Sequence, residues 1–139
     1  MGQAWIFLLI TIICWGITPI LEKFGLKNLD AFSGLFIRSA AVFFILLIAF
    51  IGSGKISSLS KVPLKTIIIF SITGILAGLV GMWTYFKVLK INPSSKIVPL
   101  AATYPLVTAI LGVYILKEEF SWPRIVGTVL IVAGIFLVK

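Results

Sequence analysis

The chain has 139 residues, of which 60% are hydrophobic and 12% are charged, and its mean hydropathy is +1.22. These values lie outside the balance of a soluble globular domain and predict an integral membrane protein. The net charge of +8 does not indicate nucleic-acid binding, because most lysines fall in loops or at helix ends, where they contact lipid headgroups.

Five apolar runs separated by short basic loops predict five membrane-spanning helices. The first run has eighteen residues without a charge, which would extend roughly 27 Å as a helix, close to the hydrocarbon thickness of a bilayer. The expected helices cover residues 4–21, 31–52, 66–86, 97–116 and 121–138. No polar stretch is long enough for a second domain, so we expect one all-α membrane domain over residues 1–139.

The first predicted helix carries a polar stripe. Thr11, Trp15, Thr18 and Glu22 follow one another at spacings of four, three and four, which places them on one helix face. A helix facing only lipid would not need such a stripe, so this face is expected to meet a partner helix or a cavity. Packing and substrate contact are equally compatible with it. Pro19 is expected to kink this helix.

The second predicted helix contains one charge, Arg38, about 10 Å along its axis. A charge at that depth can cost about 3 kcal/mol unless it finds a partner or its stem reaches the headgroups. Two interpretations stay open. The side chain either snorkels to the interface, or it attracts an anionic substrate or pairs with Glu22.

Small residues line one face of the third predicted helix. Gly74 and Gly78 form a small-xxx-small pair, and Gly81 continues the face. Such a face lets another backbone approach closely, either within one bundle or across a dimer. Trp83 and Tyr85, near the end of this helix, are candidates for the aromatic belt or for a cavity lining, with the belt favoured for Trp83.

The fourth predicted helix contains Pro99 and Pro105, each of which removes a backbone hydrogen bond. Membrane helices tolerate this where neighbours or a cavity satisfy the freed carbonyl. Tyr104 lies beside the second proline, and Thr108 and Gly112 continue a face of small residues. This helix is therefore the best candidate for a cavity wall.

The predicted spans contain no combination of side chains that is typical of an enzyme active site. The sequence has no histidine, and its three glutamates all lie near helix ends. Cys14 is its single cysteine, so neither an internal disulfide nor a cysteine metal site is possible. We therefore expect no enzyme activity, no catalytic residue, no metal and no cofactor.

The basic residues are almost evenly divided between the two sides of the membrane. If five helices alternate, one side holds Lys55, Lys61, Lys65, Lys117 and Arg124, and the other holds Lys23, Lys27, Lys87, Lys90, Lys96 and Lys139. Neither orientation is clearly favoured. The chain either follows a weak orientation bias or inserts both ways and pairs with itself in antiparallel orientation.

The order of residues resembles the EamA-type repeat of the drug/metabolite transporter superfamily over nearly the whole chain. The resemblance rests on Trp15-Gly16 through Lys23, on Tyr85, on the 99–105 segment, and on Leu116-Lys117-Glu118 leading to Gly127 and Gly134. Lys117 stands where a glycine is common, a departure expected to affect only the turn.

This resemblance implies a half-size transporter. Most members of the family carry two five-helix repeats, and because five is odd, tandem repeats lie in opposite orientations. A single repeat must then obtain the missing half from another chain. Together with the nearly even loop charges, this favours an antiparallel dual-topology homodimer in a prokaryotic cell membrane, which would move a small metabolite by alternating access. The open alternatives are a non-transporting membrane assembly subunit, one half of a heterodimeric transporter, and a flippase for a lipid-linked substrate.

The resemblance also implies roles for individual residues. Helices one, three and four would line the cavity, and Glu118 would be structural in the last turn. Related four-helix multidrug pumps have a glutamate where this chain has Cys14 and Trp15, which argues against proton-driven export of cationic drugs. With Thr11 and Arg38 added from the residue patterns, the cavity candidates are Thr11, Trp15, Thr18, Arg38, Trp83, Tyr85, Tyr104 and Thr108. The helix-packing candidates are Gly74, Gly78, Gly81, Gly112, Gly127 and Gly134.

Overall fold

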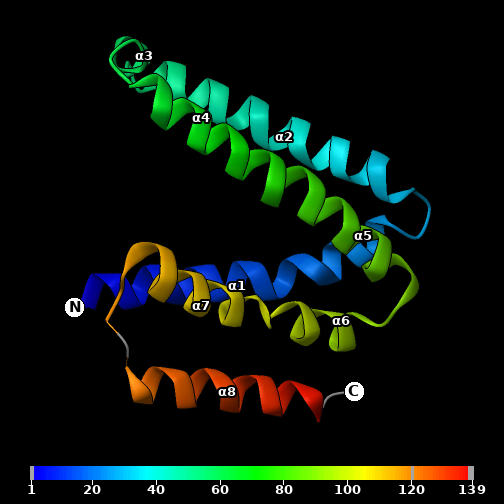
Figure 1. The fold of residues 1–139 in the computed structure, drawn as a ribbon. Helices are drawn as coiled ribbons and strands as arrows, with labels where there is room; N and C mark the ends of the chain where they lie inside the picture. The colour runs from blue at the N-terminus through cyan, green and yellow to red at the C-terminus, as the bar shows by residue number, and fades with distance from the viewer. Residues whose placement is uncertain (1, 120, 138–139) are drawn as a thin grey trace. The chain divides into compact units, whose positions relative to one another are not determined.

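The structure, a computed structural model, describes residues 2–119 and 121–137 and is all-α over those residues (Figure 1). Its elements in chain order are α1 (Gly2–Gly25), α2 (Ala31–Gly52), α3 (Ile56–Leu59), α4 (Leu64–Thr73), the π-helix η1 (Gly74–Gly81), α5 (Met82–Ile91), α6 (Ser94–Ala101), α7 (Tyr104–Leu116) and α8 (Trp122–Phe136).

Four helical stretches are long and apolar enough to cross a membrane. They are Gln3–Gly25, Ala31–Gly52, Leu64–Ile91 and Ser94–Leu116, and a shorter apolar helix covers Ile125–Ile135. Large apolar side chains are exposed along all of them, as expected where lipid is the solvent. The chain is therefore an integral membrane protein with about five helical spans.

Two of these spans are not single regular helices. The third is longer than the expected 66–86, because α4, η1 and α5 follow one another without interruption. The fourth is divided at Ala102 and Thr103, just before Pro105, and the Thr103 hydroxyl donates to the Leu100 carbonyl at 2.9 Å. Pro105 lies in the first turn of α7, where its missing N–H leaves no internal hydrogen bond unmade. The expected end of the fifth span, Val138, lies outside the described residues.

The chain divides into two compact units, Met1–Ile91 and Asn92–Lys139. In the first unit, the turn between α1 and α2 packs against α5. Leu26 comes from this turn, Ala31 and Leu35 come from α2, and Phe86 and Leu89 come from α5, and all five are buried. We call these five residues the end cluster. Leu89 has no exposed surface, so this cluster is the one fully packed core in the described part of the unit.

Polar contacts close the same end of the first unit. Lys23, in the last turn of α1, donates from Nζ to the carbonyls of Leu89 at 2.6 Å and Lys90 at 2.9 Å. Lys90 donates in turn to the Leu29 carbonyl at 3.0 Å. The last carbonyls of a helix lack internal partners, and lysine supplies them. These two lysines therefore tie α5 to α1 and to the following turn.

The glycine-rich face of the third span is open within its own unit. A Cβ added at Gly74 or Gly78 would meet no atom within 4 Å, whereas one at Gly81 would lie 3.1 Å from the Leu76 carbonyl oxygen of its own helix. The close approach expected at Gly74 and Gly78 is thus not made inside the first unit. It stays a prediction for a surface outside that unit.

In the second unit, α7 ends at a residue in the left-handed conformation. Lys117 has φ 54° and ψ 36°, and its N–H donates to the Gly112 carbonyl. A left-handed residue after a helix is usually glycine, which explains why glycine is the common residue at this position. Gly112 is buried, and a Cβ there would lie 3.2 Å from the Glu118 carboxylate, so the predicted small-residue packing at Gly112 is a contact with this turn.

Candidate functional site

Arg38 and Glu22 form an ion pair inside the first unit. Arg38 Nε lies 3.5 Å from Glu22 Oε1. The two side chains differ in exposure, 10% for Glu22 and 43% for Arg38, so the carboxylate is inside and the guanidinium faces outward. The sequence left two interpretations of Arg38 open, and the structure shows the pairing with Glu22.

The ion pair leaves part of the carboxylate unsatisfied. Glu22 Oε1 is buried and has no hydrogen-bond partner among the described residues. The 3.5 Å separation is long for a charge-assisted hydrogen bond, which is normally about 2.7–2.9 Å. An arginine has five N–H donors, so a pair made through Nε alone leaves the terminal nitrogens open to another acceptor.

Aromatic side chains from α5 lie beside the end cluster. Trp83 and Tyr85 are partly buried and pack against it. The Trp83 ring meets Phe32 edge-on, with centroids 6.2 Å apart, and Lys87 Nζ lies 3.9 Å from the Trp83 ring centroid. The Tyr85 phenol interacts electrostatically with Glu22. Tyr85 is therefore near the ion pair, whereas Trp83 is held by an aromatic and a cation–π contact.

The polar stripe of α1 is satisfied mainly by its own backbone. Thr11 donates to the Phe7 carbonyl at 2.9 Å, and Thr18 donates to the Cys14 carbonyl at 2.7 Å. Trp15 is 65% exposed, and Pro19 is buried within the continuous helix α1. Glu22, the last member of the stripe, is the one whose side chain contacts another helix through a charge.

Two cavity candidates belong to the second unit. Tyr104 is 58% exposed, and the Thr108 hydroxyl donates to the Tyr104 carbonyl at 3.4 Å. Neither residue lines the groove found in this unit. Whether they share a cavity with the candidates of the first unit stays a prediction.

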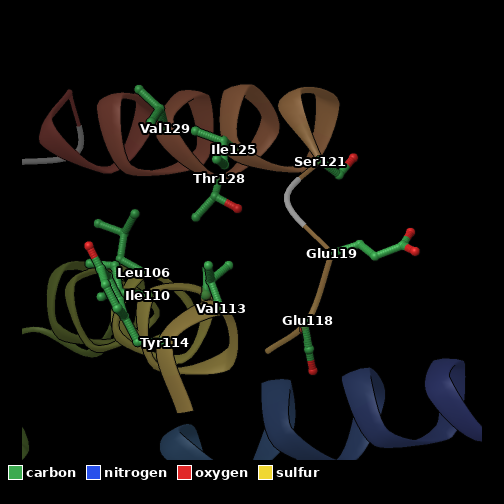
Figure 2. A pocket seen from close by; sticks show the side chains of 11 residues that line it. Leu106, Ile110, Val113, Tyr114, Glu118, Glu119, Ser121, Ile125, Thr128 and Val129 are labelled. Atoms are coloured by element: carbon green, nitrogen blue, oxygen red, sulfur yellow. The ribbon is translucent and has the colours of Figure 1, made fainter. Parts of the chain in front are cut away.

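A groove runs between α7 and α8 in the second unit, with a volume of about 390 Å³ (Figure 2). Its walls are apolar, and two carboxylates lie at the turn between the helices, where Figure 2 shows Glu119 pointing away from the helix faces. The volume is in the range of small-molecule sites. It is lined by Leu106, Ala109, Ile110, Val113, Tyr114, Glu118, Glu119, Ser121, Ile125, Thr128 and Val129.

Sequence reasoning placed Glu22 on the stripe but did not include it among the cavity candidates, because it lies near a helix end. Helix position alone did not reveal that its carboxylate is buried against α2. The lysine contacts at Lys23 and Lys90 were also missed. Their signal was present, since both residues stand in the last turn of a helix. Among the described residues, no group of three or more acidic, histidine or cysteine side chains is placed to hold a metal ion.

Comparison with known proteins gives several related sequences. A protein of Archaeoglobus fulgidus described as an uncharacterized transporter is 27% identical over 128 residues, covering 91% of this chain and 44% of that protein. The chain thus spans less than half the length of this relative. A Sinorhizobium protein described as an uncharacterized transporter in the cobO 3′ region is 24% identical over 139 residues, covering 99% of this chain and 97% of that protein.

A third relative has a more specific description. The probable 4-amino-4-deoxy-L-arabinose-phosphoundecaprenol flippase subunit ArnF of Erwinia tasmaniensis is 34% identical over 85 residues, or 60% of this chain and 65% of that protein. No solved structure matches the chain. The model of the EamA-like transporter family matches residues 3–139, nearly the whole sequence. This chain belongs to the EamA-like transporter family.

Proposed function

We propose that this chain transports a small metabolite across a prokaryotic cell membrane by alternating access, as an antiparallel homodimer of two oppositely inserted copies. The family and the transporter descriptions of its relatives support membrane transport. The observation that carries the finer proposal is one five-span repeat whose small-residue face is open within its own unit. A second copy would complete an inverted-repeat plan.

The loop charges support both orientations. With five spans, the basic residues divide five against six, or five against seven if Arg38 reaches the second side. Lys23 and Lys90 belong to the larger group, and both are bound to backbone carbonyls of the protein. Lysines held in this way contribute less to headgroup contact, which brings the two sides closer to balance.

The η1 segment supplies a candidate site of movement. π-Helical turns within α-helices are rare and often occur at functional sites. η1 covers Gly74–Gly81 in the middle of the third span, next to α5 and the end cluster. Alternating access would be produced by bending at η1 while the end cluster keeps α1, α2 and α5 together.

Orientation is the direct test, and the two ends of α2 provide matched positions. Asn28 is exposed in the turn before α2, and Ser57 is exposed in α3 after it. A helix of 22 residues separates them, so they lie on opposite sides of the membrane. Each is changed to cysteine in a Cys14→Ala background, because Cys14 is itself exposed. Intact cells are then treated with a membrane-impermeant thiol reagent.

Dual topology predicts that both single-cysteine variants label from outside, each to about half of its total after permeabilisation. Labelling of one variant alone would give a fixed orientation and exclude the antiparallel homodimer. Transport would then require an oppositely oriented partner chain.

A second candidate function is favoured by one relative. The Erwinia tasmaniensis protein is described as a subunit of a flippase for a phosphoundecaprenol-linked amino sugar. The apolar groove between α7 and α8 could hold a polyprenyl or acyl chain, since its walls are aliphatic and its volume is about 390 Å³. In this case the cargo is lipid-linked, and the chain works as one subunit of a flippase.

Filling the groove separates the two candidates. Val113→Trp should reduce the translocation of a fluorescent polyprenyl phosphate in vesicles about tenfold, because the indole occupies the lipid path. Val107→Trp is the matched control, since Val107 lies on the same helix, is 58% exposed and does not line the groove. Equal translocation by the two variants would remove the groove from the lipid path.

A further inference from the structure

Glu22 and Arg38 differ in burial, and the distance between them is longer than that of a charge-assisted hydrogen bond. The carboxylate is nine-tenths buried, its Oε1 has no hydrogen-bond donor among the described residues, and the guanidinium is 43% exposed. A pair that served only to neutralise two charges would be expected to close to hydrogen-bond distance. This pair is stretched, with its positive member on the outside.

The pair lies close to the packed end of the unit. Glu22 is four residues before Leu26 on the chain, and Arg38 is three residues after Leu35, so both charges lie one helical turn from the end cluster. The end cluster and the lysine contacts of Lys23 and Lys90 close the loop side. The exposed guanidinium of Arg38 is therefore the part of the pair that a ligand contacts first.

An anion arriving there meets Arg38 first. Its oxygens would take the terminal guanidinium N–H groups, for which a carboxylate or phosphate has the matching geometry. The anion and Glu22 then compete for the same positive charge. Glu22 would be left as a buried carboxylate without a counter-charge, which a low-dielectric site strongly disfavours. Uptake of one proton from water converts it to a neutral carboxylic acid and removes that cost.

We propose that Glu22 and Arg38 form a proton-coupled anion site, in which protonation of Glu22 releases Arg38 to bind an anionic group of the cargo. One proton adds to the Glu22 carboxylate as one anion binds the Arg38 guanidinium, so a monovalent anionic group enters the site without a change in net charge. Deprotonation restores the ion pair and expels the anion. This inference rests on the proposed transport function and supplies its substrate class and its coupling ion.

Other charged groups around Glu22 are engaged elsewhere. From α5, the Tyr85 phenol interacts electrostatically with Glu22, Lys87 lies over the Trp83 ring, and Lys90 binds the Leu29 carbonyl. On α1 itself, Lys23 donates to carbonyls of α5. Among the described residues, Arg38 of α2 is the cation paired with Glu22. Tyr85 is therefore the one other titratable group whose removal must be tested.

The test measures anion binding against pH, using the full chain in phosphatidylcholine vesicles and sulfate as the probe. Sulfate keeps its charge between about pH 5 and pH 8, so a change in affinity reports on the protein. With one proton bound per anion, the affinity of the wild type for sulfate should fall about tenfold per pH unit above the pH at which Glu22 loses its proton. A second arm replaces part of the phosphatidylcholine with phosphatidylglycerol, which shows whether a lipid phosphate occupies the site instead.

Matched variants assign the two roles. Glu22→Gln should bind sulfate with the affinity that wild type has at low pH, at every pH, because Arg38 is permanently released. Arg38→Gln should lose binding at every pH. The double variant Glu22→Gln with Arg38→Gln removes both charges without leaving one buried and unpaired, so it controls for folding while also binding no sulfate. Tyr85→Phe should keep the wild-type pH dependence.

Several outcomes would overturn the proposal. Unchanged sulfate binding in Arg38→Gln would remove the anion site. A pH dependence that persists in Glu22→Gln, or disappears in Tyr85→Phe, would place the proton elsewhere. By contrast, sulfate that binds only when phosphatidylglycerol is absent would support the proposal and identify a lipid phosphate as the competing anion. None of these measurements requires flux or a dimer, so the proposed function is tested separately by the labelling of Asn28 and Ser57.

Discussion

Two regions of the first unit are built differently. At one end, α1, α2 and α5 meet around the end cluster, with Leu89 fully buried and lysines bound to helix carbonyls. In the middle of the third span, a Cβ added at Gly74 or Gly78 of the π-helix η1 would meet no atom within 4 Å. Figure 1 shows α1 separating from the α2 and α4 pair away from the end near α5. The end cluster is closed by packing, whereas the small-residue face of η1 is open within its own unit.

The most severe test of this comparison is a cavity at the packed end. Leu89→Ala should destabilise the first unit by about 3 kcal/mol, because a fully buried leucine loses its packing and leaves a void. Leu76→Ala is the matched control in η1. Leu76 is 61% exposed, so the same change there should have a much smaller effect. Chemical denaturation of the purified protein in detergent measures both.

Equal destabilisation by Leu89→Ala and Leu76→Ala would contradict the comparison. It would mean that Leu76 in η1 is as tightly packed as Leu89, for instance by a partner retained in detergent. Repeating the measurement over a range of protein concentrations distinguishes these cases, because only a partner makes the stability concentration-dependent.

A large side chain on the open face tests what covers it. Gly78→Leu has room within the unit, so the monomer should keep its fold, while self-association should weaken about tenfold or more. Val80→Leu, on the same helix segment and 48% exposed, is the control and should associate as the wild type does. Dimer populations in detergent or bilayers, measured by cross-linking across a dilution series, give the result. Unchanged association of Gly78→Leu would exclude this face from the dimer.

Several features of the structure could be predicted from the sequence. The all-α membrane fold follows from hydropathy, because the bilayer admits few structures and each span must satisfy its own backbone. The pairing of Arg38 with Glu22 could be anticipated as one of two options, since a charge within a span requires a partner. The family assignment followed from the residue order and is confirmed over residues 3–139.

Other features could not be read from residue patterns. Nothing in the spacing of Gly74 and Gly78 distinguishes an α-helix from a π-helix, because the same glycines permit both. The depth of Glu22 depends on how α1 crosses its neighbours, which is a tertiary property. The lysine contacts at Lys23 and Lys90 required knowing which helix ends meet.

The turn after α7 offers a smaller effect with a definite sign. Lys117 has φ 54°, a conformation that costs a residue with a Cβ roughly 1 kcal/mol and costs glycine little. Lys117→Gly should therefore stabilise the second unit by about 1 kcal/mol, measured by thermal unfolding of the purified protein. Lys117→Ala keeps the Cβ and removes the charge, so it should give no such gain. A gain in both variants would assign the effect to charge and not to backbone conformation.

The smallest predicted effect concerns Asp30, the residue just before α2. Asp30 caps α2, accepting hydrogen bonds from the backbone N–H groups of Phe32 at 2.9 Å and Ser33 at 3.1 Å. Hydrogen bonds from Ser33, first through its side chain and then its backbone, lower the pKa of the Asp30 carboxyl below its ordinary 3.8. Because the folded pKa is the lower one, the contribution of Asp30 is complete above the unfolded pKa and is lost as pH falls through the folded pKa.

Asp30→Ala should therefore lower stability at neutral pH and converge with the wild type in acid. In an Asp30→Asn variant the amide oxygen would still cap α2 but could not titrate, so the stability of this variant should lack the acid-dependent loss. The difference between the two variants isolates the charge from the hydrogen bonds. Should Asp30→Ala and the wild type lose stability in parallel as pH falls, the acid sensitivity would belong to another carboxyl, and Asp30 would act at this end through geometry alone.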